Sequence, residues 1–429
     1  MTATSEDGGP SEAYCTYNII SENNLYGNNL ESIMVSAMLN FENTNATCSN
    51  NTIENNVITK NRGQGNAIFC YSDNNGFSGN LECSQNFIIN NSITNNITAG
   101  LYLAGCISFN ISDNTFLDGG LDIAMEEVSE YMTSHHIDTS NTVNGGTLYY
   151  YANQVGLTPS NFTGAGEILL IKSNHSEIGN VVITDIDYAI LIGYCYNITI
   201  QTFTGVNNTR DILIVFSNLT NIYNSNFIDT AQHGIHSADS SYNYFYDNNF
   251  NSSGIYLWSY GKNNSLQLLL NDNINTSNLV NGKPLYHFVS QNGINSSSYS
   301  NTPGQLILVN CNDSIIEDTH VNNTNIPIQL NYCYNTTIRR NTLQKIYAGI
   351  VIQSSNKNTI LNNTILDFEM IAIYIVYGNN NTITGNVMNG SIEGSVIVIN
   401  GGLDNYINEN YINGKLQLSP FVIDDSGNG

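Results

Sequence analysis

The segment NYCYNTTIRRNTL at residues 331–343 holds all four positions that define the repeat of this chain. A small residue, Cys333, stands five positions before Ile338, while Asn341 and the apolar Leu343 stand three and five positions after it. Isoleucine recurs in step with Ile338 at intervals of 22, 22, 23 and 24 residues, through Ile316, Ile338, Ile360, Ile383 and Ile407. An apolar position that returns at this period predicts a stacked repeat structure.

The same pattern runs through much of the rest of the chain. Small residues fill the first position at Cys48, Cys83, Cys106, Ser173, Cys195, Ser217, Ser240, Cys311, Ser355, Gly378 and Gly402, and asparagine fills the third at Asn56, Asn91, Asn114, Asn248, Asn363, Asn386 and Asn410. Short apolar runs between Asn-rich and Gly-rich turns are typical of strands. We therefore predict an all-β fold, a single-stranded right-handed parallel β-helix with coils of about 22–24 residues. The isoleucines should stack inside, and the asparagines should stack at a bend, where their amides can bond to one another and where asparagine tolerates left-handed backbone.

A longer repeat is superimposed on the coil repeat. HIDTSNTVNGGTLYYY at residues 136–151 returns as NINTSNLVNGKPLYHF at 273–288, and GYCYNITI at 193–200 returns as NYCYNTTI in the opening segment. A block of about six coils is therefore duplicated. We expect one continuous solenoid, divided into an N-terminal segment or cap (1–44), irregular coils (45–130), a first block (131–267), its duplicate (268–420) and a tail (421–429).

These motifs carry a family resemblance. The N-T-I-x-x-N-x-I coil and the D-T-S-N-x-V-N-G-[KG]-x-L-Y-Y segment resemble the NosD-like, or CASH-domain, right-handed parallel β-helix proteins common on archaeal surfaces, especially in methanogens. The resemblance covers nearly everything after residue 45, and VNGKPLY at 280–286 is its most specific part. It implies an exported protein of the cell surface or envelope. It transfers no catalytic residue, because the group is defined by its scaffold.

The net charge of the chain excludes some classes of binding partner. The chain has 35 Asp and Glu against 11 Lys and Arg, a net charge of −24. Such a surface repels phosphate backbones and anionic lipid, so we expect no nucleic acid and no membrane surface as partner. No apolar stretch reaches the roughly 18 to 20 residues of a membrane span. The first residues lack a basic segment and an apolar core, so either the protein is cytoplasmic or its leader is absent from this chain. The family resemblance favours the second alternative, an extracellular protein.

The cysteines follow the repeat. Cys83 and Cys106 are 23 residues apart and Cys311 and Cys333 are 22 apart, so each pair is expected on adjacent coils, at a separation that permits a disulfide. The alternative is that these thiols fill a corner where serine and glycine serve equally well. No Cys or His spacing indicates zinc.

Candidate catalytic groups are sparse. Asp185 and Asp187 are expected to alternate on one strand face, and His233-Gly234 resembles a fragment of a polygalacturonase site, but the companion carboxylates of that family are missing. Arg339 and Arg340 are adjacent but lack the acidic calcium cluster of pectate lyases. We expect no catalytic residue.

A metal site near His135 and His136 is also considered. Glu126, Glu127 and Glu130 lie close by in sequence, but adjacent residues on a strand point to opposite faces. His and Met residues do not cluster elsewhere, so we expect no metal, copper included, and no cofactor.

Asn-x-Ser/Thr sequons, about 20 in number, are the strongest chemical signal. Sequons that carry glycans lie at exposed positions of exported proteins, although a composition so rich in Asn, Ser and Thr creates many by chance. The glycosylation candidates are Asn45, Asn96, Asn110, Asn161, Asn197, Asn207, Asn218, Asn251, Asn295, Asn335 and Asn380.

Two functions remain in competition. The first is a non-enzymatic structural protein of a surface layer, sheath or filament, N-glycosylated and self-assembling into a homo-oligomer or polymer, with glycans or other envelope proteins as further partners. The rival is a β-helix protein that binds or cleaves polysaccharide, with sugar rings stacked on Tyr149, Tyr150, Tyr151 and Tyr286. Tyrosine also favours strands for reasons unrelated to ligands.

Overall fold

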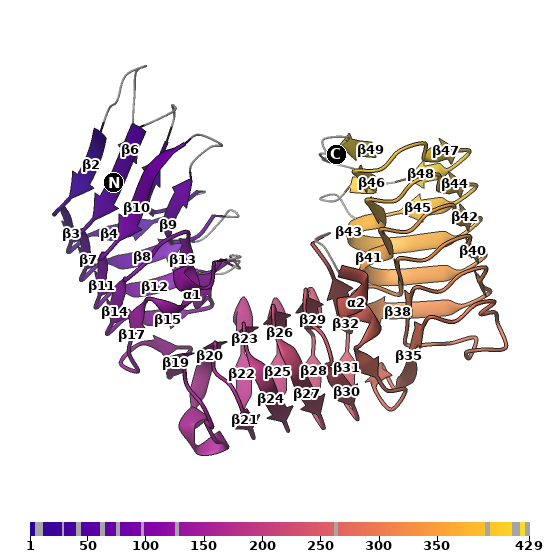
Figure 1. Cartoon of the computed structure of the whole chain (residues 1–429), viewed down its shortest axis with the longest axis horizontal. Coiled ribbons are helices and arrows are strands. Elements are labelled where there is room, and N and C mark those ends of the chain that lie inside the picture. The colour runs from indigo at the N-terminus through magenta and orange to yellow at the C-terminus, as the bar shows by residue number, and fades with distance from the viewer. Residues whose placement is uncertain are drawn as a thin grey trace. The chain divides into compact units, whose positions relative to one another are not determined.

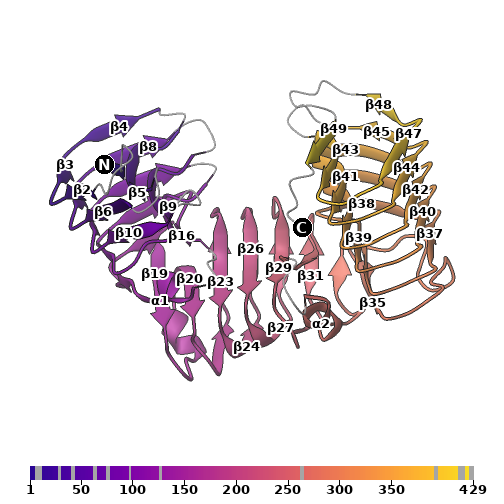
Figure 2. The same ribbon diagram turned by 45° about the horizontal axis from the view of Figure 1, so that its top comes forward.

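The computed structural model describes residues 1–4, 12–27, 30–39, 44–60, 65–73, 78–95, 98–124, 128–260, 265–390, 395–413 and 421–424. The described chain is a right-handed parallel β-helix, as predicted (Figures 1 and 2). Its short strands stack in several ladders, and each coil contributes one strand to a ladder. It forms two compact units. The first contains Met1–Ile198 and Val206–Val215, and the second contains Thr199–Gly205 and Phe216–Gly429.

The first unit begins with four ladders. One is β1 (Thr2–Thr4), β5 (Ile33–Met38), β9 (Ile68–Asp73), β13 (Leu101–Ala104) and β16 (Leu121–Ile123). The next two are β2 (Glu12–Thr16), β6 (Thr44–Ser49) and β10 (Gly79–Ser84), and β3 (Ile19–Ser21), β7 (Thr52–Glu54), β11 (Phe87–Ile89), β14 (Asn110–Ser112) and β17 (His136–Ile137). The last is β4 (Asn24–Tyr26), β8 (Val57–Lys60), β12 (Ser92–Asn95), β15 (Thr115–Leu117) and β18 (Thr142–Val143).

The other elements follow in chain order. The first unit continues with α1 (Glu130–Thr133), β19 (Gly146–Ala152), the short 3-10 helix η1 (Pro159–Phe162), β20 (Ala165–Ile171), β21 (Ser176–Gly179), β22 (Val182–Thr184), β23 (Tyr188–Gly193) and β26 (Arg210–Val215). Strands β24 (Tyr196–Gln201) and β25 (Thr204–Val206) contain residues of both units. The second unit starts with β27 (Asn218–Tyr223), β28 (Asn226–Ile228), β29 (His233–Ala238), β30 (Tyr244–Tyr246), β31 (Asn249–Asn251), β32 (Ile255–Trp258), α2 (Ser265–Leu270), β33 (Asn273–Ile274), β34 (Leu279–Val280) and β35 (Lys283–Val289).

The second unit then runs through the most regular coils. These contain β36 (Gln305–Val309), β37 (Ile315–Glu317), β38 (His320–Thr324), β39 (Ile328–Asn331), β40 (Thr337–Arg339), β41 (Thr342–Gln353), β42 (Thr359–Leu361), β43 (Thr364–Val376), β44 (Thr382–Thr384), β45 (Val387–Asn389), β46 (Ser395–Asn400), β47 (Tyr406–Asn408), β48 (Tyr411–Asn413) and β49 (Phe421–Asp424).

The isoleucine ladder has the predicted register. Ile316 pairs with Ile338, Ile338 with Ile360, Ile360 with Ile383, and Ile383 with Ile407. The first four are fully buried, so each contributes on the order of 2 kcal/mol of burial. This column fixes the register of the coils, because a shift by one residue would turn the isoleucines outward.

The asparagine ladder is also present, with one correction. The side-chain amides form a chain in which Asn341 donates to Asn363, Asn363 to Asn386, and Asn386 to Asn410, each at 2.9 Å. The left-handed backbone that asparagine tolerates is found not at these asparagines but at the residue before each one, such as Arg340 at φ 54° and Asn362 at φ 53°. The preceding residue makes the turn, which leaves the asparagine free to point inward.

Coil length varies in the first unit. Ile20 pairs with Ile53 and Ile53 with Ile88, which are 33 and 35 residues apart, whereas Ile88 and Ile111 are 23 apart. Strands β2 to β5 pair in register with later strands, so the described residues before 45 contribute coils to the solenoid. At the other end β49 pairs with β46.

One coil in each unit breaks the pattern. In the first hairpin coil (residues 130–152), a helix, α1, follows β16, and β18 pairs antiparallel with β19. In the second hairpin coil (residues 265–289), α2 follows β32, and β34 pairs antiparallel with β35. The turns are the Asn-Gly pairs of the VNG motif, at φ 50° and 80° for Asn144 and Gly145 and at φ 51° and 73° for Asn281 and Gly282. Two consecutive left-handed residues are what a tight two-residue hairpin requires.

Candidate functional site: a polar pocket in each unit

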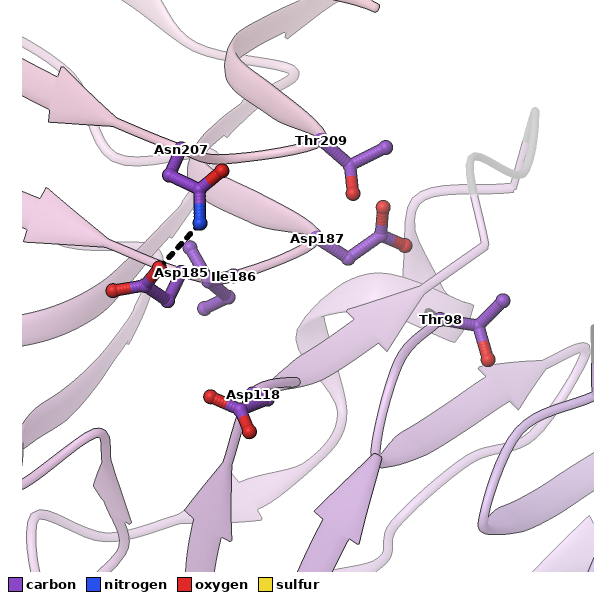
Figure 3. A pocket seen from close by; sticks show the side chains of 7 residues that line it. All are labelled: Thr98, Asp118, Asp185, Ile186, Asp187, Asn207 and Thr209. Atoms are coloured by element: carbon purple, nitrogen blue, oxygen red, sulfur yellow. Dashed lines mark hydrogen bonds between the residues drawn. The ribbon is translucent and has the colours of Figure 1, made fainter. Parts of the chain in front are cut away.

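Each unit contains a polar pocket beside its hairpin coil. The first-unit pocket has a volume of about 230 Å³ and is lined by Thr98, Asp118, Asp185, Ile186, Asp187, Asn207 and Thr209 (Figure 3). The second-unit pocket has a volume of about 450 Å³ and is lined by Asp229, Thr230, Ala231, Ser252, Asn323, Thr324, Asn325, Lys345, Ile346, Tyr347, Asp367 and Glu369. The first is built mainly from turns at the ends of short strands, whereas the second also takes residues from within the long strands β41 and β43.

The sequence repeat relates these pockets. The offset of 138 residues that links the two YCYN segments also links lining residues: Asp185 to Asn323, Ile186 to Thr324, Asp187 to Asn325, Asn207 to Lys345, and Thr209 to Tyr347. Each of these positions lines a pocket in its own unit. The two pockets therefore occupy the same place in the repeat.

The VNG asparagine joins the two walls of each pocket. Asn144 accepts the backbone N–H of Asp118 at 2.9 Å and donates to the carbonyl oxygens of Thr184 and Asp185 at 2.8 and 3.0 Å. Asn281 repeats this arrangement in the second unit: it accepts from the N–H of Ser252 at 3.1 Å and donates to the carbonyl oxygens at positions 322 and 323 at 3.1 and 2.5 Å. The hairpin turn thus connects the coil before it to the coil after it.

The paired aspartates of the first unit lie in a turn. Asp185 is left-handed, at φ 57°, and lies with Asp187 between β22 and β23, so the prediction that they alternate on a strand face is wrong. They nevertheless line the same pocket, and Asp185 accepts a hydrogen bond of 2.6 Å from the Asn207 amide (Figure 3). Burial raises the pKa of Asp187, while Arg210, whose guanidinium is 3.7 Å away, opposes the rise.

A buried acid lies behind the first-unit pocket. Glu167 on β20 is 2% exposed and accepts the backbone N–H of Leu121 on β16 at 3.0 Å. Burial raises its pKa well above the usual range, and the nearby carboxylates Asp122 and Asp187 add to the effect. Burial likewise raises the pKa of Asp122 to about 7, although Arg210 opposes the rise. Burial therefore favours the protonated form of Glu167 in the folded chain.

The repeat counterpart of Glu167 is an amide. Gln305 on β36 accepts the backbone N–H of Ile255 at 3.0 Å, and its amide donates to the carbonyl oxygens of Ile255 and Ile326 at 2.7 and 2.8 Å. Ile255 lies on β32, which precedes the second hairpin coil as β16 precedes the first. Glu167 and Gln305 thus take the same place in the repeat, and each accepts a backbone N–H from the strand that precedes the hairpin coil.

The wall of the second-unit pocket is ordered by hydrogen bonds. Asn325, only 1% exposed, bonds through its amide to Nδ1 of the buried His233 at 3.0 Å. The Asn323 amide donates to the Ser252 hydroxyl at 2.7 Å, and that hydroxyl donates to Asp229 at 3.2 Å. The His233 ring lies edge-on to Tyr347, with centroids 5.7 Å apart.

The charges of this pocket are unbalanced. Asp229, Asp367 and Glu369 supply three carboxyl groups, and burial raises the pKa of Glu369. Lys345 is the single cationic side chain of the lining. It is exposed, left-handed at φ 53°, and makes no ion pair with any residue that the structure describes.

The tyrosines proposed for sugar stacking line neither pocket. Tyr149 and Tyr151 stack at 6.0 Å, pack against Phe162 and donate to the carbonyl oxygens of Thr163 and Asn161. Tyr150 donates to the Met132 carbonyl at 2.7 Å. Tyr286 stacks on Phe288 and accepts the backbone N–H of Ser300. Their role in sugar binding stays a prediction.

All eight cysteines are buried free thiols in this structure. Cys311 and Cys333 lie on adjacent coils, with the Cys311 backbone N–H 3.4 Å from the Cys333 sulfur, and burial raises the pKa of both thiols. Cys83 pairs in register with Cys48, and burial and the Cys83 thiol raise the pKa of Cys106. The Cys83–Cys106 and Cys311–Cys333 disulfides stay predictions.

The glycosylation candidates differ in exposure. Those that are exposed are Asn161, Asn197, Asn207, Asn251, Asn295, Asn335 and Asn380, and those that are half-buried are Asn45, Asn110 and Asn218. Asn96 lies outside the described residues. Several exposed amides bond to side chains one coil away, as Asn335 does to Asp313 at 2.7 Å. Glycan occupancy stays a prediction.

The remaining charged candidates are placed as follows. His135 is buried, its ring bonds to the Tyr131 carbonyl, and burial lowers its pKa to about 4, while His136 is exposed. Glu126 and Glu127 lie outside the described residues. Arg339 and Arg340 form surface ion pairs with Glu317 and Asp318.

Metal binding finds no support in the described part of the chain. No group of three or more His, Cys, Asp or Glu side chains there is arranged to hold a metal ion. No helix among the described residues is long and apolar enough to cross a membrane.

The second-unit pocket was missed from the sequence. His233 was noticed, but Asn325, Lys345 and Tyr347 lie 92 or more residues further along the chain. The 138-residue offset, applied to Asp185 and Asp187, was the signal that points to positions 323 and 325.

The fold and its two hairpin coils define a repetitive parallel β-helix protein. Residues 270–429 match the model of the family described as periplasmic copper-binding protein (NosD), which confirms the NosD-like resemblance over this part of the chain. Because the described residues offer no cluster of copper ligands, we derive no step that involves copper.

Solved structures of similar fold include an epimerase and an adhesin. The A-module of the Azotobacter vinelandii mannuronan C-5 epimerase AlgE4 is 11% identical, with 90% of each chain covered and a TM-score of 0.25. PfbA, a surface adhesin of Streptococcus pneumoniae, is 13% identical over 80% of this chain and 85% of its own, with a TM-score of 0.26. Scores this low carry no argument about function. No curated protein matches the chain.

Proposed function

We propose that this chain is an exported β-helix protein that binds polysaccharide through the second-unit pocket. The observation that carries the proposal is the composition of the pocket. A half-buried aromatic ring, an ammonium group, two asparagine amides, hydroxyl groups and three carboxyl groups line one hollow of about 450 Å³. Ligand pockets of proteins commonly measure 300 to 1,000 Å³.

These groups match the chemistry of a sugar. Sugar hydroxyls both donate and accept, so they need carboxylates and amides beside them. The apolar face of a sugar ring packs against an aromatic ring, which Tyr347 supplies. The bonds of Asn325 to His233 and of Asn323 to Ser252 fix two of the polar groups before a ligand arrives, which lowers the entropy cost of binding.

Export is supported by the matched family, whose description names the periplasm, and by the resemblance to envelope proteins. The same two observations support a location in the periplasm or on the cell surface.

The test is a titration of the full chain with soluble polysaccharides by isothermal calorimetry. We expect saturable binding of at least one polysaccharide, which Asn323→Ala weakens by removing an amide of the pocket wall. Tyr334→Ala, which removes an exposed tyrosine that does not line the pocket, is the matched control and should leave affinity unchanged. Absence of binding across the panel would refute the proposal.

A second candidate is a structural subunit that assembles through its ends. The observation in favour is the exposure of large side chains on the first and last described coils, where Tyr14, Tyr17, Leu403, Tyr406 and Tyr411 are each at least half exposed. Such side chains beside strand edges suit contact with a second copy. Sedimentation velocity over a range of concentrations tests this: self-association that Tyr406→Asp with Tyr411→Asp abolishes supports it, and a monomer at every concentration rejects it.

A further inference from the structure

We propose that Lys345 and Tyr347 select the ligand of the second-unit pocket, and that this ligand is an uncharged, hydroxyl-rich oligosaccharide; the inference rests on the polysaccharide binding proposed above. It follows from comparing the two pockets, which share one scaffold but differ in a few side chains.

The two pockets share part of their scaffold. In both units a VNG asparagine joins the coils before and after the hairpin, and five lining positions of the first-unit pocket correspond to five of the second-unit pocket across the repeat. The residues at positions 207 and 345 are both left-handed, at φ 56° and 53°. At the five corresponding positions every side chain differs between the pockets, so these side chains can give the pockets different ligands.

Lys345 adds donors that the first unit lacks. Its counterpart Asn207 is engaged within the chain, because its amide donates to Asp185 at 2.6 Å. The Lys345 ammonium has no ion-pair partner among the described residues, so its three N–H groups are available to ligand oxygens. Beside it in the ladder, the Asp367 carboxylate accepts a hydrogen bond from Gln344 at 2.9 Å and keeps further acceptor sites.

Tyr347 adds a supported ring. Its counterpart is Thr209, which has no ring. Tyr347 packs on a small apolar cluster of Ile326, Ala348 and Val351 and meets the edge of His233. A ring held in this way loses little freedom when a sugar stacks on it.

The charges exclude acidic sugars. Three carboxyl groups surround one ammonium, and the whole chain carries −24, so a uronate or sulfated chain meets repulsion both at long range and in the pocket. A cationic amino sugar is attracted by the carboxyl groups but meets the like charge of Lys345. An uncharged chain can use the carboxylates as acceptors and the ammonium as a donor without either penalty.

The experiment compares affinities of the full chain for three soluble probes: neutral manno- and gluco-hexasaccharides, oligouronates of equal length, and chitosan oligomers. The wild type should bind a neutral probe at least tenfold more tightly than either charged class. Lys345→Asn and Tyr347→Thr, which install the first-unit residues, should each weaken the neutral probe by roughly tenfold, the order of one charged hydrogen bond or one aromatic contact. Tyr347→Phe should keep most of the affinity, because the ring remains.

Matched controls separate this inference from the function on which it rests. Asn207→Ala with Thr209→Ala alters the counterpart positions in the first unit and should leave affinity unchanged. If the wild type binds no glycan, the proposed function fails. If it binds a neutral glycan and either Lys345→Asn or Tyr347→Thr has no effect, or if it prefers uronates or chitosan, only the present inference is overturned. Equal losses in the first-unit control overturn it as well.

Discussion

Replacing Glu167 by glutamine should stabilise the protein, and more so as the pH rises. In the folded chain, burial raises the pKa of Glu167 well above 4.5, the value near which it ionises in the unfolded chain. Its folded pKa is raised, so the folded state binds a proton that the unfolded state has released. Stability is thus fully present below pH 4.5 and falls as the pH rises toward the folded pKa.

The size of the effect follows from linkage. Each pH unit between 4.5 and the folded pKa of Glu167 costs about 1.4 kcal/mol of stability, because the folded chain keeps a proton that the unfolded chain has released. Glu167→Gln removes this cost and keeps an acceptor for the Leu121 N–H. Gln305 shows that the site accommodates an amide, since it fills the same place in the second unit with both ends bonded.

The assay is urea unfolding of the wild type and of Glu167→Gln at half-unit steps from pH 5 to 8. Gln305→Glu is the mirror-image control, because it places a carboxyl group in the equivalent buried position. Gln305→Glu should be less stable than the wild type, and its loss of stability should grow as the pH rises. The reasoning is refuted if Glu167→Gln is less stable than the wild type, or if its gain does not grow between pH 5 and pH 7.

Three further outcomes are expected. Ile338→Ala, which removes one member of the buried column, should lower the free energy of unfolding by about 2 to 5 kcal/mol in the same assay, and a loss below 1 kcal/mol would contradict the stacked core. Asn363→Ala leaves the Asn341 amide without its acceptor and should cost about 1 to 3 kcal/mol, whereas Arg340→Ala, on the surface, should leave the unfolding midpoint unchanged. Intact mass after alkylation should show no modified thiol until the chain is unfolded, and a mass lower by two hydrogens per bridge would reveal Cys83–Cys106 or Cys311–Cys333 disulfides; rapid alkylation of the folded chain would contradict the burial of the thiols.

The core of the coils could be predicted because its residues recur at a regular interval in the sequence. Ile316 to Ile407 repeat in sequence as they stack in space, and the Asn341 to Asn410 chain does the same, so counting residues gives contacts directly. The left-handed residue before each ladder asparagine could not be recognised from the sequence, because Arg340, Asn362 and Gly385 share no side-chain type. At these turns, the place in the repeat decides which residue has positive φ, whatever its side chain.

The pockets could not be read from the period. Their walls meet across the hairpin coils, where residues such as His233 and Asn325 come together although 92 positions separate them. The VNG motif was recognised as a signature, but its physical role, a tight turn whose asparagine ties two coils together, appears only in the hydrogen bonds of Asn144 and Asn281. Comparison of the two copies, more than either copy alone, shows which side chains are scaffold and which are free to select a ligand.

The most direct test of the account is hydrogen–deuterium exchange of the full chain with and without a saturating neutral oligosaccharide. The account predicts added protection at the segments Asn323–Asn325 and Lys345–Tyr347, with no change at Asp185–Asp187. Unchanged exchange at the second-unit turns, or protection confined to the strands of Tyr149–Tyr151 and Tyr286, would contradict it.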